Sequence, residues 1–167
     1  MNENRQQHLS VKLNGLDLWT HYSLPIVCAF VCVLIFSKST GHDSLDRNTI
    51  TIFLVVAVLT TWMQTHMLRF TAFTTNRDAS VNYHAVMKVI KAIHWKISKD
   101  HEASKIIATV PGFPKSARSW GERVEIQFDG NHVYVNSICD PRRWAAITAW
   151  GRNSENVELI RHTVMDG

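Results

Sequence analysis

Two long stretches without Asp, Glu, Lys or Arg dominate the hydrophobic pattern of the chain. They cover residues 18–37 and 48–68, and a polar segment over residues 38–47 separates them. An α-helix needs about 20 mostly apolar residues to cross the hydrocarbon core of a bilayer, so each stretch is long enough to span it. The sequence therefore predicts a transmembrane hairpin of two helices over residues 18–68.

Aromatic and histidine residues lie at the ends of the two predicted spans that would share one membrane interface. Trp19 and Tyr22 begin the first span and Trp62 lies near the end of the second, as in the aromatic belts of membrane proteins. His21 and His66 lie at the same level and are interpreted as interfacial anchors. The alternative is a haem or a quinone headgroup bound at these two histidines. The sequence suggests no further ligand, so we expect neither a metal site nor a bound cofactor.

Helical periodicity returns after the second span. A linker over residues 69–80 is followed by apolar side chains at three- and four-residue steps over residues 81–99, with lysines along one edge. This pattern predicts a long amphipathic helix that packs on a sheet or, as an alternative, a basic helix that lies on anionic headgroups. A final helix is predicted to begin near Ser154, because Asn153 or Ser154 can cap it.

Alternating polar and apolar residues predict a β-hairpin. Residues 122–128 and 132–138 alternate on either side of an Asp-Gly-Asn turn, in which Gly130 is expected to have a positive φ. An apolar run over residues 105–110 predicts a third strand. A similar alternation over residues 9–13 predicts a short strand that lies on the folded domain or on a partner, because a lone strand is not stable in water.

Together these elements predict an α+β fold class. An N-terminal arm over residues 1–17, the hairpin and the linker would precede one domain over residues 81–167, with the order α-β-β-β-α and an antiparallel sheet. Helices on one face of this sheet would leave the other face more polar, which explains the alternation in its strands.

The distribution of charge predicts the orientation in the membrane. Of the 18 Lys and Arg residues, 14 lie from Arg69 onward together with 10 of the 14 acids, so the formal net charge of +4 belongs to the C-terminal part. Cytoplasmic segments retain Lys and Arg. We therefore expect a two-pass protein of the bacterial inner (cytoplasmic) membrane, with both termini and the soluble domain in the cytoplasm. Cys28, Cys32 and Cys139 lack metal-ligand spacing and suit a reducing compartment.

A set of arginines and tryptophans in the C-terminal half is the candidate ligand or partner surface. Its members are Arg118, Trp120, Arg142, Arg143, Trp144, Trp150 and Arg152. Such residues can bind phosphate or lipid headgroups, but they also pack as arginine stems over tryptophan faces, which is the interpretation that we favour. Nucleic acid is the weakest candidate ligand, because ten acids dilute the positive charge of this part.

The end of the chain combines a strand, a polar loop and a capped helix. The strand contains residues 133–137 (Val-Tyr-Val-Asn-Ser), the loop contains Arg142 and Arg143, and the helix begins at residues 151–157 (Gly-Arg-Asn-Ser-Glu-Asn-Val). This combination resembles the ending of small uncharacterised bacterial domains that are often attached to membrane helices. The resemblance implies a membrane-anchored α+β domain and assigns no catalytic residue.

The sequence favours a binding function over catalysis. It contains no Gly-x-Ser-x-Gly element, phosphate-binding loop or dinucleotide-binding sequence. The leading hypothesis is a non-enzymatic membrane-anchored interaction module, such as an accessory subunit of a bacterial inner-membrane complex, whose hairpin packs against a protein partner or a second copy of the chain. The alternative is a small-molecule or lipid-headgroup-binding domain, or a weak enzyme, that uses a groove between the long helix and the sheet.

Overall fold

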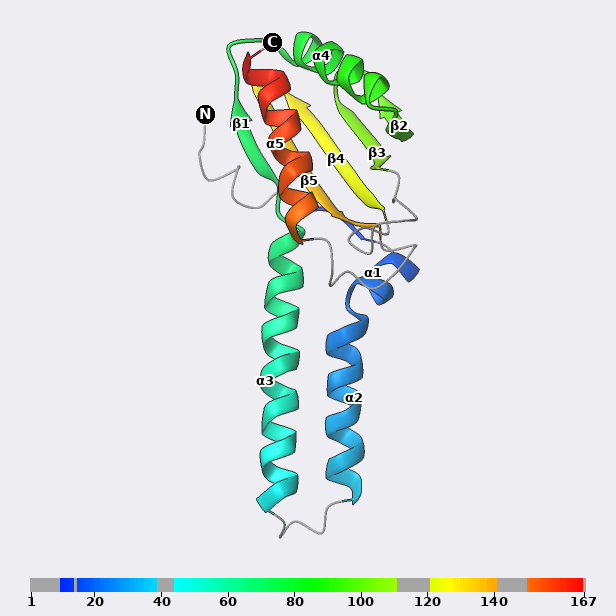
Figure 1. Cartoon of the computed structure of the whole chain (residues 1–167), viewed down its shortest axis with the longest axis vertical. Coiled ribbons are helices and arrows are strands. Elements are labelled where there is room, and N and C mark those ends of the chain that lie inside the picture. Colours follow the sequence, from blue (N-terminus) through cyan, green and yellow to red (C-terminus); the bar gives the residue numbers. More distant parts are fainter. Residues whose placement is uncertain (1–9, 14, 39–43, 111–120, 141–149, 167) are drawn as a thin grey trace.

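The computed structural model describes residues 10–13, 15–38, 44–110, 121–140 and 150–166, and shows an apolar helix pair extending from one end of an α+β domain (Figure 1). The described residues contain five α-helices and five β-strands. The helices are α1 (Leu16–His21), α2 (Ser23–Lys38), α3 (Ser44–Met67), α4 (Ala79–Ala92) and α5 (Trp150–Asp166). The strands are β1 (Thr71–Thr74), β2 (Lys96–His101), β3 (Lys105–Val110), β4 (Glu122–Asp129) and β5 (His132–Cys139).

The helix pair consists of α2 and α3, which lie side by side (Figure 1). Cys28 and Cys32 are buried, and the Cys32 thiol donates to the carbonyl oxygen of Ile50 on α3 at 3.8 Å. Among the described residues one helix, α3 over Arg47–Met67, is long and apolar enough to cross a membrane, and most of it is exposed. The second helix of the pair, α2, is apolar but shorter.

The first predicted span is not one continuous helix. Its beginning forms α1, which ends at His21, and α2 starts at Ser23 after a turn at Tyr22. Pro25 explains the break, because its ring would clash with the carbonyl of the residue four positions earlier, which is His21. The prediction of one helix over residues 18–37 was therefore wrong, and a two-pass topology stays a prediction.

The domain is built on an antiparallel sheet with the strand order β1-β5-β4-β3-β2. Helices α4 and α5 cover one face of this sheet (Figure 1). Alternate side chains of the central strands point into that layer, as the period of two requires. The fully buried members of this core are Val86, Ile90, Ile106, Ala108, Val124, Ile126, Val133, Val135 and Ile160. An α+β fold with an antiparallel sheet is thereby confirmed.

The predicted hairpin is present as β4 and β5. Asp129 pairs with His132 across a two-residue turn, and Gly130 has a φ of +57°, which confirms the expected positive angle. Positive φ at the first central residue is the geometry of a type II′ turn, which favours glycine because it lacks a Cβ. The third predicted strand is β3, with the predicted bounds.

The predicted long helix ends early. Helix α4 stops at Ala92, because His94 adopts a φ of +58°, and the amides of His94 and Trp95 donate to the carbonyls of Lys91 and Ile90 at 3.2 and 3.0 Å. These two bonds form a Schellman motif, the usual end of a helix. The residues after it form the edge strand β2. Helix α4 lies at the end of the domain away from the helix pair (Figure 1), which argues against its lying on headgroups beside the hairpin.

Three further boundaries differ from the predictions. The predicted linker contains β1, which pairs with β5 from Thr71↔Val135 to Thr74↔His132. The predicted N-terminal strand is reduced, within the described residues, to an isolated bridge between Ser10 and Arg69. Helix α5 begins at Trp150, four residues before the predicted Ser154.

Candidate functional site

The face of the sheet opposite α4 and α5 carries a row of polar side chains. Lys105 pairs with Gln127 and Thr109 with Arg123 in the register of β3 and β4, and Ile107 pairs with Glu125 between them. Because neighbouring residues of a strand point to opposite faces, these six side chains share the face that the two helices leave open. The apolar residues of β3 and β4 fill the core on the helix side of the sheet, and the residues that alternate with them form a mostly polar surface on the other side.

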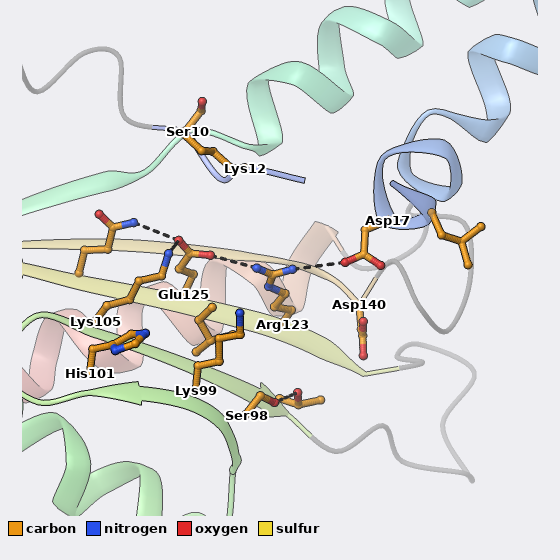
Figure 2. A pocket seen from close by; sticks show the side chains of 14 residues that line it. Ser10, Lys12, Asp17, Ser98, Lys99, His101, Lys105, Arg123, Glu125 and Asp140 are labelled. Carbon is orange, nitrogen blue, oxygen red and sulfur yellow. Dashed lines mark hydrogen bonds and ion pairs between the residues drawn. The ribbon is translucent and has the colours of Figure 1, made fainter. Parts of the chain in front are cut away.

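This surface forms the floor of a cleft of about 1180 Å³ (Figure 2). Its walls come from β2, from the N-terminal arm and from α1, so segments that are far apart in sequence enclose it. The lining residues outside β3 and β4 are Ser10, Lys12, Leu16, Asp17, Ser98, Lys99, His101 and Asp140. The cleft is large enough for a small organic ligand, since ligand pockets usually measure about 300–1,000 Å³.

Glu125 is the centre of the charge network in the cleft. Its side chain is 4% exposed and forms ion pairs with Lys105 and with Arg123, whose Nη2 lies 3.3 Å from Oε2. Gln127 donates to its other oxygen at 3.0 Å. A buried carboxylate is tolerated when it is paired and hydrogen-bonded, and Glu125 meets that condition. Glu125 thus compensates the charge of two cations on the floor of the cleft (Figure 2).

Arg123 also connects the sheet to α1. Its Nη1 lies 3.7 Å from Oδ2 of Asp17. Charge-assisted N–H···O contacts usually measure about 2.7–2.9 Å, so this pair is long. The guanidinium of Arg123 therefore contacts both Glu125 on the floor of the cleft and, more weakly, Asp17 of α1, the helix that precedes α2.

Strand β2 supplies three more cleft residues, Ser98, Lys99 and His101. Between Lys99 and His101, Asp100 points to the other face and accepts hydrogen bonds from the Tyr83 hydroxyl of α4 at 2.9 and 3.0 Å. Burial of Tyr83, together with this bond, raises the pKa of its phenol. The bond holds the side chain of Asp100 on the helix side of the sheet. Its neighbours Lys99 and His101 therefore point to the other side, into the cleft (Figure 2).

A packed junction joins the domain to the helix pair. Asn136 of β5 donates to the carbonyl oxygens of Met67 and Arg69 at 2.8 and 2.7 Å, and so satisfies backbone groups at the end of α3. His21 contacts the carbonyl of Gln64 at 3.1 Å through its Nε2. A second apolar cluster closes this junction; it contains Val11, Leu13, Leu68 and Ile138.

An open groove of about 570 Å³ lies between α2 and α3, on the side of the junction. Its lining is almost entirely apolar and includes the small residues Ala29, Ala57 and Thr61. Tyr22 and Trp62 stand among the larger residues that line it. Small side chains let helix backbones approach closely, so the groove has the lining of a helix-packing surface.

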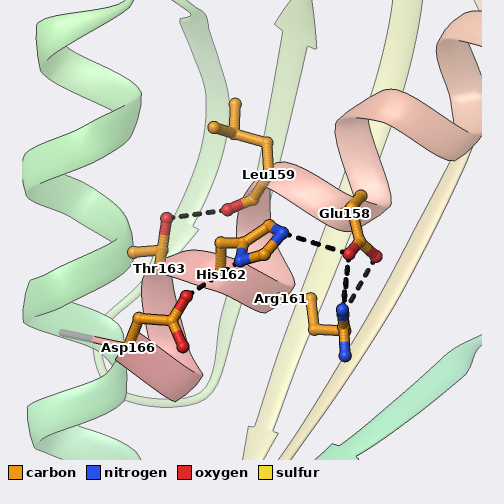
Figure 3. Close-up of polar contacts among 6 residues, drawn as sticks. All are labelled: Glu158, Leu159, Arg161, His162, Thr163 and Asp166. Atoms are coloured by element: carbon orange, nitrogen blue, oxygen red, sulfur yellow. Dashed lines mark hydrogen bonds and ion pairs between the residues drawn. The ribbon is translucent and has the colours of Figure 1, made fainter.

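The outer face of α5 carries an exposed chain of charged groups (Figure 3). Arg161 donates to Glu158 at 2.6–3.0 Å, and His162 lies 3.2 Å from Glu158 and 2.8 Å from Asp166. The hydrogen bond from Arg161 holds the pKa of the Glu158 carboxyl below its usual value. Because these charges compensate one another along the helix, they stabilise α5 and do not form a ligand site.

The predicted interfacial residues lie around the junction. Trp19 and Trp62 are 65% and 67% exposed, whereas His21 is buried. Tyr22 lies 3.2 Å from the hydroxyl of Thr65, and the ring of His66 contacts Trp62 with centroids 5.9 Å apart. His21 and His66 therefore have different neighbours, and a haem or quinone headgroup at these residues stays the untested alternative to interfacial anchoring.

Most of the predicted ligand surface cannot be placed. Five of its members lie outside the described residues: Arg118, Trp120, Arg142, Arg143 and Trp144. Trp150 begins α5, although its side chain is also outside the described part. Arg152 is half-buried with its Nε 3.8 Å from Oε1 of the buried Glu122, so it has a structural partner. The predicted groove between helix and sheet stays a prediction, while the described part of that layer is filled by the core.

The sequence interpretation did not identify the cleft. The polar positions of residues 122–128 were visible as one face of a strand, but nothing local showed that the N-terminal arm and α1 would enclose that face. Lys99 had been assigned to the end of the long helix. A search for known relatives gives no guidance either, since no family model, curated protein or solved structure matches this chain.

Proposed function

We propose that this chain is a non-enzymatic, membrane-anchored interaction module, such as an accessory subunit of a bacterial inner-membrane complex. In this proposal α2 and α3 lie in the bilayer and the α+β domain stands at its cytoplasmic surface. The outward side chains of α2 and α3 support their placement in the bilayer, because they are large, apolar and exposed, and exposed apolar patches mark membrane or protein contacts. They include Val27, Phe30, Val33, Phe36, Ile52, Leu54, Val55, Val58 and Leu59.

The packed junction is the observation that carries the proposal. A flexible linker would be sufficient to tether a domain to a membrane. Here the end of α3 is instead held by Asn136, and the pair of Asp17 with Arg123 joins α1 to β4. A displacement of the helices would therefore move the sheet, as is required of a subunit that connects a membrane complex to a cytoplasmic domain.

The groove between α2 and α3 supports a partner inside the membrane. Cys28 and Cys32 are buried, so they serve the packing of the pair itself. Ala29 and Ala57 line the groove, which remains open to the surroundings. We take a transmembrane helix of a partner subunit as its occupant, because small residues favour close helix packing in lipid.

Replacing Ala57 by phenylalanine is expected to release the partner helix. The larger side chain would fill the groove, whereas Val55→Phe, on the exposed surface of the same helix, would leave it open. Native membranes are extracted with a polymer that keeps the lipid, and the mass of the particles that contain the chain is measured. We expect the wild type and Val55→Phe in one larger particle and Ala57→Phe in a smaller one. Equal masses for all three would contradict the proposed docking.

The orientation is tested by thiol labelling in intact cells. In a variant without Cys28, Cys32 and Cys139, a cysteine replaces either Ser44, on the loop side of the hairpin, or Asp166, at the end of α5. A reagent that crosses only the outer membrane is expected to label the first variant and not the second, because Lys and Arg retain the domain in the cytoplasm. Labelling of position 166 alone would place the domain on the other side, and labelling of neither would exclude a two-pass hairpin.

A further inference from the structure

The uncompensated charge of the cleft is positive. Four Lys and Arg side chains and three acids line it, which gives a formal charge of +1 with His101 neutral. Lys105 and Arg123 are engaged by Glu125 and Asp17. By contrast, within the described residues the ammonium groups of Lys12 and Lys99 have no carboxylate partner. Both side chains are exposed to solvent. Uncompensated cations in a cleft still raise the local concentration of anions, because the low-dielectric walls focus their field.

The two free ammonium groups stand on different walls. Lys12 comes from the N-terminal arm and Lys99 from β2, with the floor of β3 and β4 between them (Figure 2). Hydroxyl groups from Ser10, Ser98 and Thr109 line the same space. The hydroxyls of Ser98 and Thr109 hydrogen-bond to each other at 3.1 Å, which leaves one hydroxyl hydrogen of the pair for a ligand. Ammonium and hydroxyl donors from several elements can bind the non-bridging oxygens of a phosphate.

Arg123 gives the site a third cation and a connection to the hairpin. Its contact with Asp17 is long at 3.7 Å, so a phosphate oxygen can replace that carboxylate as a hydrogen-bond acceptor. Such a replacement would break the ion pair between Arg123 and Asp17, which joins α1 to the sheet. Occupation of the cleft and the position of α1 are therefore coupled.

We infer that the cleft binds a phosphate-bearing organic anion, with Lys12, Lys99 and Arg123 as its ligands. The cleft volume of about 1180 Å³ exceeds that of a bare ion and accommodates a headgroup-sized molecule. Two sources supply this chemistry. One is the headgroup of an anionic phospholipid, because the α1 wall continues directly into α2, and the other is a soluble phosphate ester. The second source does not depend on the membrane placement proposed above.

The experiment uses the full chain in a neutral detergent at fixed ionic strength. Phosphatidylglycerol, with phosphatidylcholine as competitor, is titrated by native mass spectrometry, and glycerol 3-phosphate is titrated by calorimetry. Both titrations are repeated with Lys99→Gln and with Arg69→Gln. The second variant is the matched control, since Arg69 is exposed near the junction but does not line the cleft.

The inference predicts that Lys99→Gln weakens binding about tenfold, which corresponds to one charge-assisted hydrogen bond. Arg69→Gln is expected to have less than a twofold effect. Lys99-dependent binding of phosphatidylglycerol alone assigns a lipid headgroup, and Lys99-dependent binding of glycerol 3-phosphate assigns a soluble ester. Binding of neither probe, or equal losses in the two variants, would overturn the inference.

Discussion

Replacing Asn136 by alanine is expected to lower the free energy of unfolding by about 1–3 kcal/mol, because it removes two hydrogen bonds, to the partly buried carbonyls of Met67 and Arg69. Asn136 is itself 3% exposed, so water does not easily replace its amide. The measurement is urea denaturation of the full chain in detergent micelles. A loss of this size would show that the connection between α3 and the sheet is part of the folded core.

A matched control for this substitution is Asn76→Ala. Asn76 is exposed between β1 and α4, and the described residues give it no hydrogen-bond partner. We expect it to change the free energy of unfolding by no more than about 0.5 kcal/mol, the usual range for surface positions. If Asn136→Ala were as mild as the control, the junction would not be rigid, and the proposed coupling between hairpin and domain would lose its main support.

The parts of the fold that follow from local sequence could be predicted. The turn at Gly130 and the alternation on both of its sides determine the β4–β5 hairpin, since a turn residue and a period of two are sufficient to set the register. The apolar run of β3 was equally clear. In each case the information lies within about ten neighbouring residues.

The missed elements depend on interactions that are distant in sequence. Strand β1 has only one partly buried residue, Phe73, and it becomes a strand because β5 offers a free edge. The end of α4 was missed because His94, and not glycine, occupies the left-handed position of the Schellman motif. Lysines continue on both sides of this point, so their spacing gave no sign of the change from helix to strand.

The candidate site was hidden for the same reason. Arg123 and Glu125 were interpreted as part of the more polar face of the sheet, and both lie on the face opposite the helices, where the side chain of Glu125 is buried. They become cleft residues only because the arm containing Lys12 and helix α1 fold back over the sheet. Side chains that meet through such long-range packing cannot be grouped from the spacing of residues in one chain.

Replacing Glu125 by glutamine is expected to change stability and anion binding in opposite directions. The free energy of unfolding should fall by about 1–3 kcal/mol, because Lys105 and Arg123 lose their shared carboxylate. Complete burial would increase this cost, but the side chains of Lys105 and Arg123 are 32% and 19% exposed and remain partly solvated. Anion affinity should rise about five- to tenfold, because both cations become available to the ligand.

Urea denaturation measures the free energy of unfolding of Glu125→Gln. Its anion affinity is measured by titration with the probe that binds the wild type, either phosphatidylglycerol or glycerol 3-phosphate. Glu155→Gln removes the same charge from the exposed side of α5 and is the control for the net charge of the chain. We expect that variant to change neither quantity beyond the error of the measurement. A Glu125→Gln protein that is both less stable and weaker in anion binding would show that Glu125 positions Lys105 and Arg123 for the ligand, and would contradict the view that it only compensates their charge.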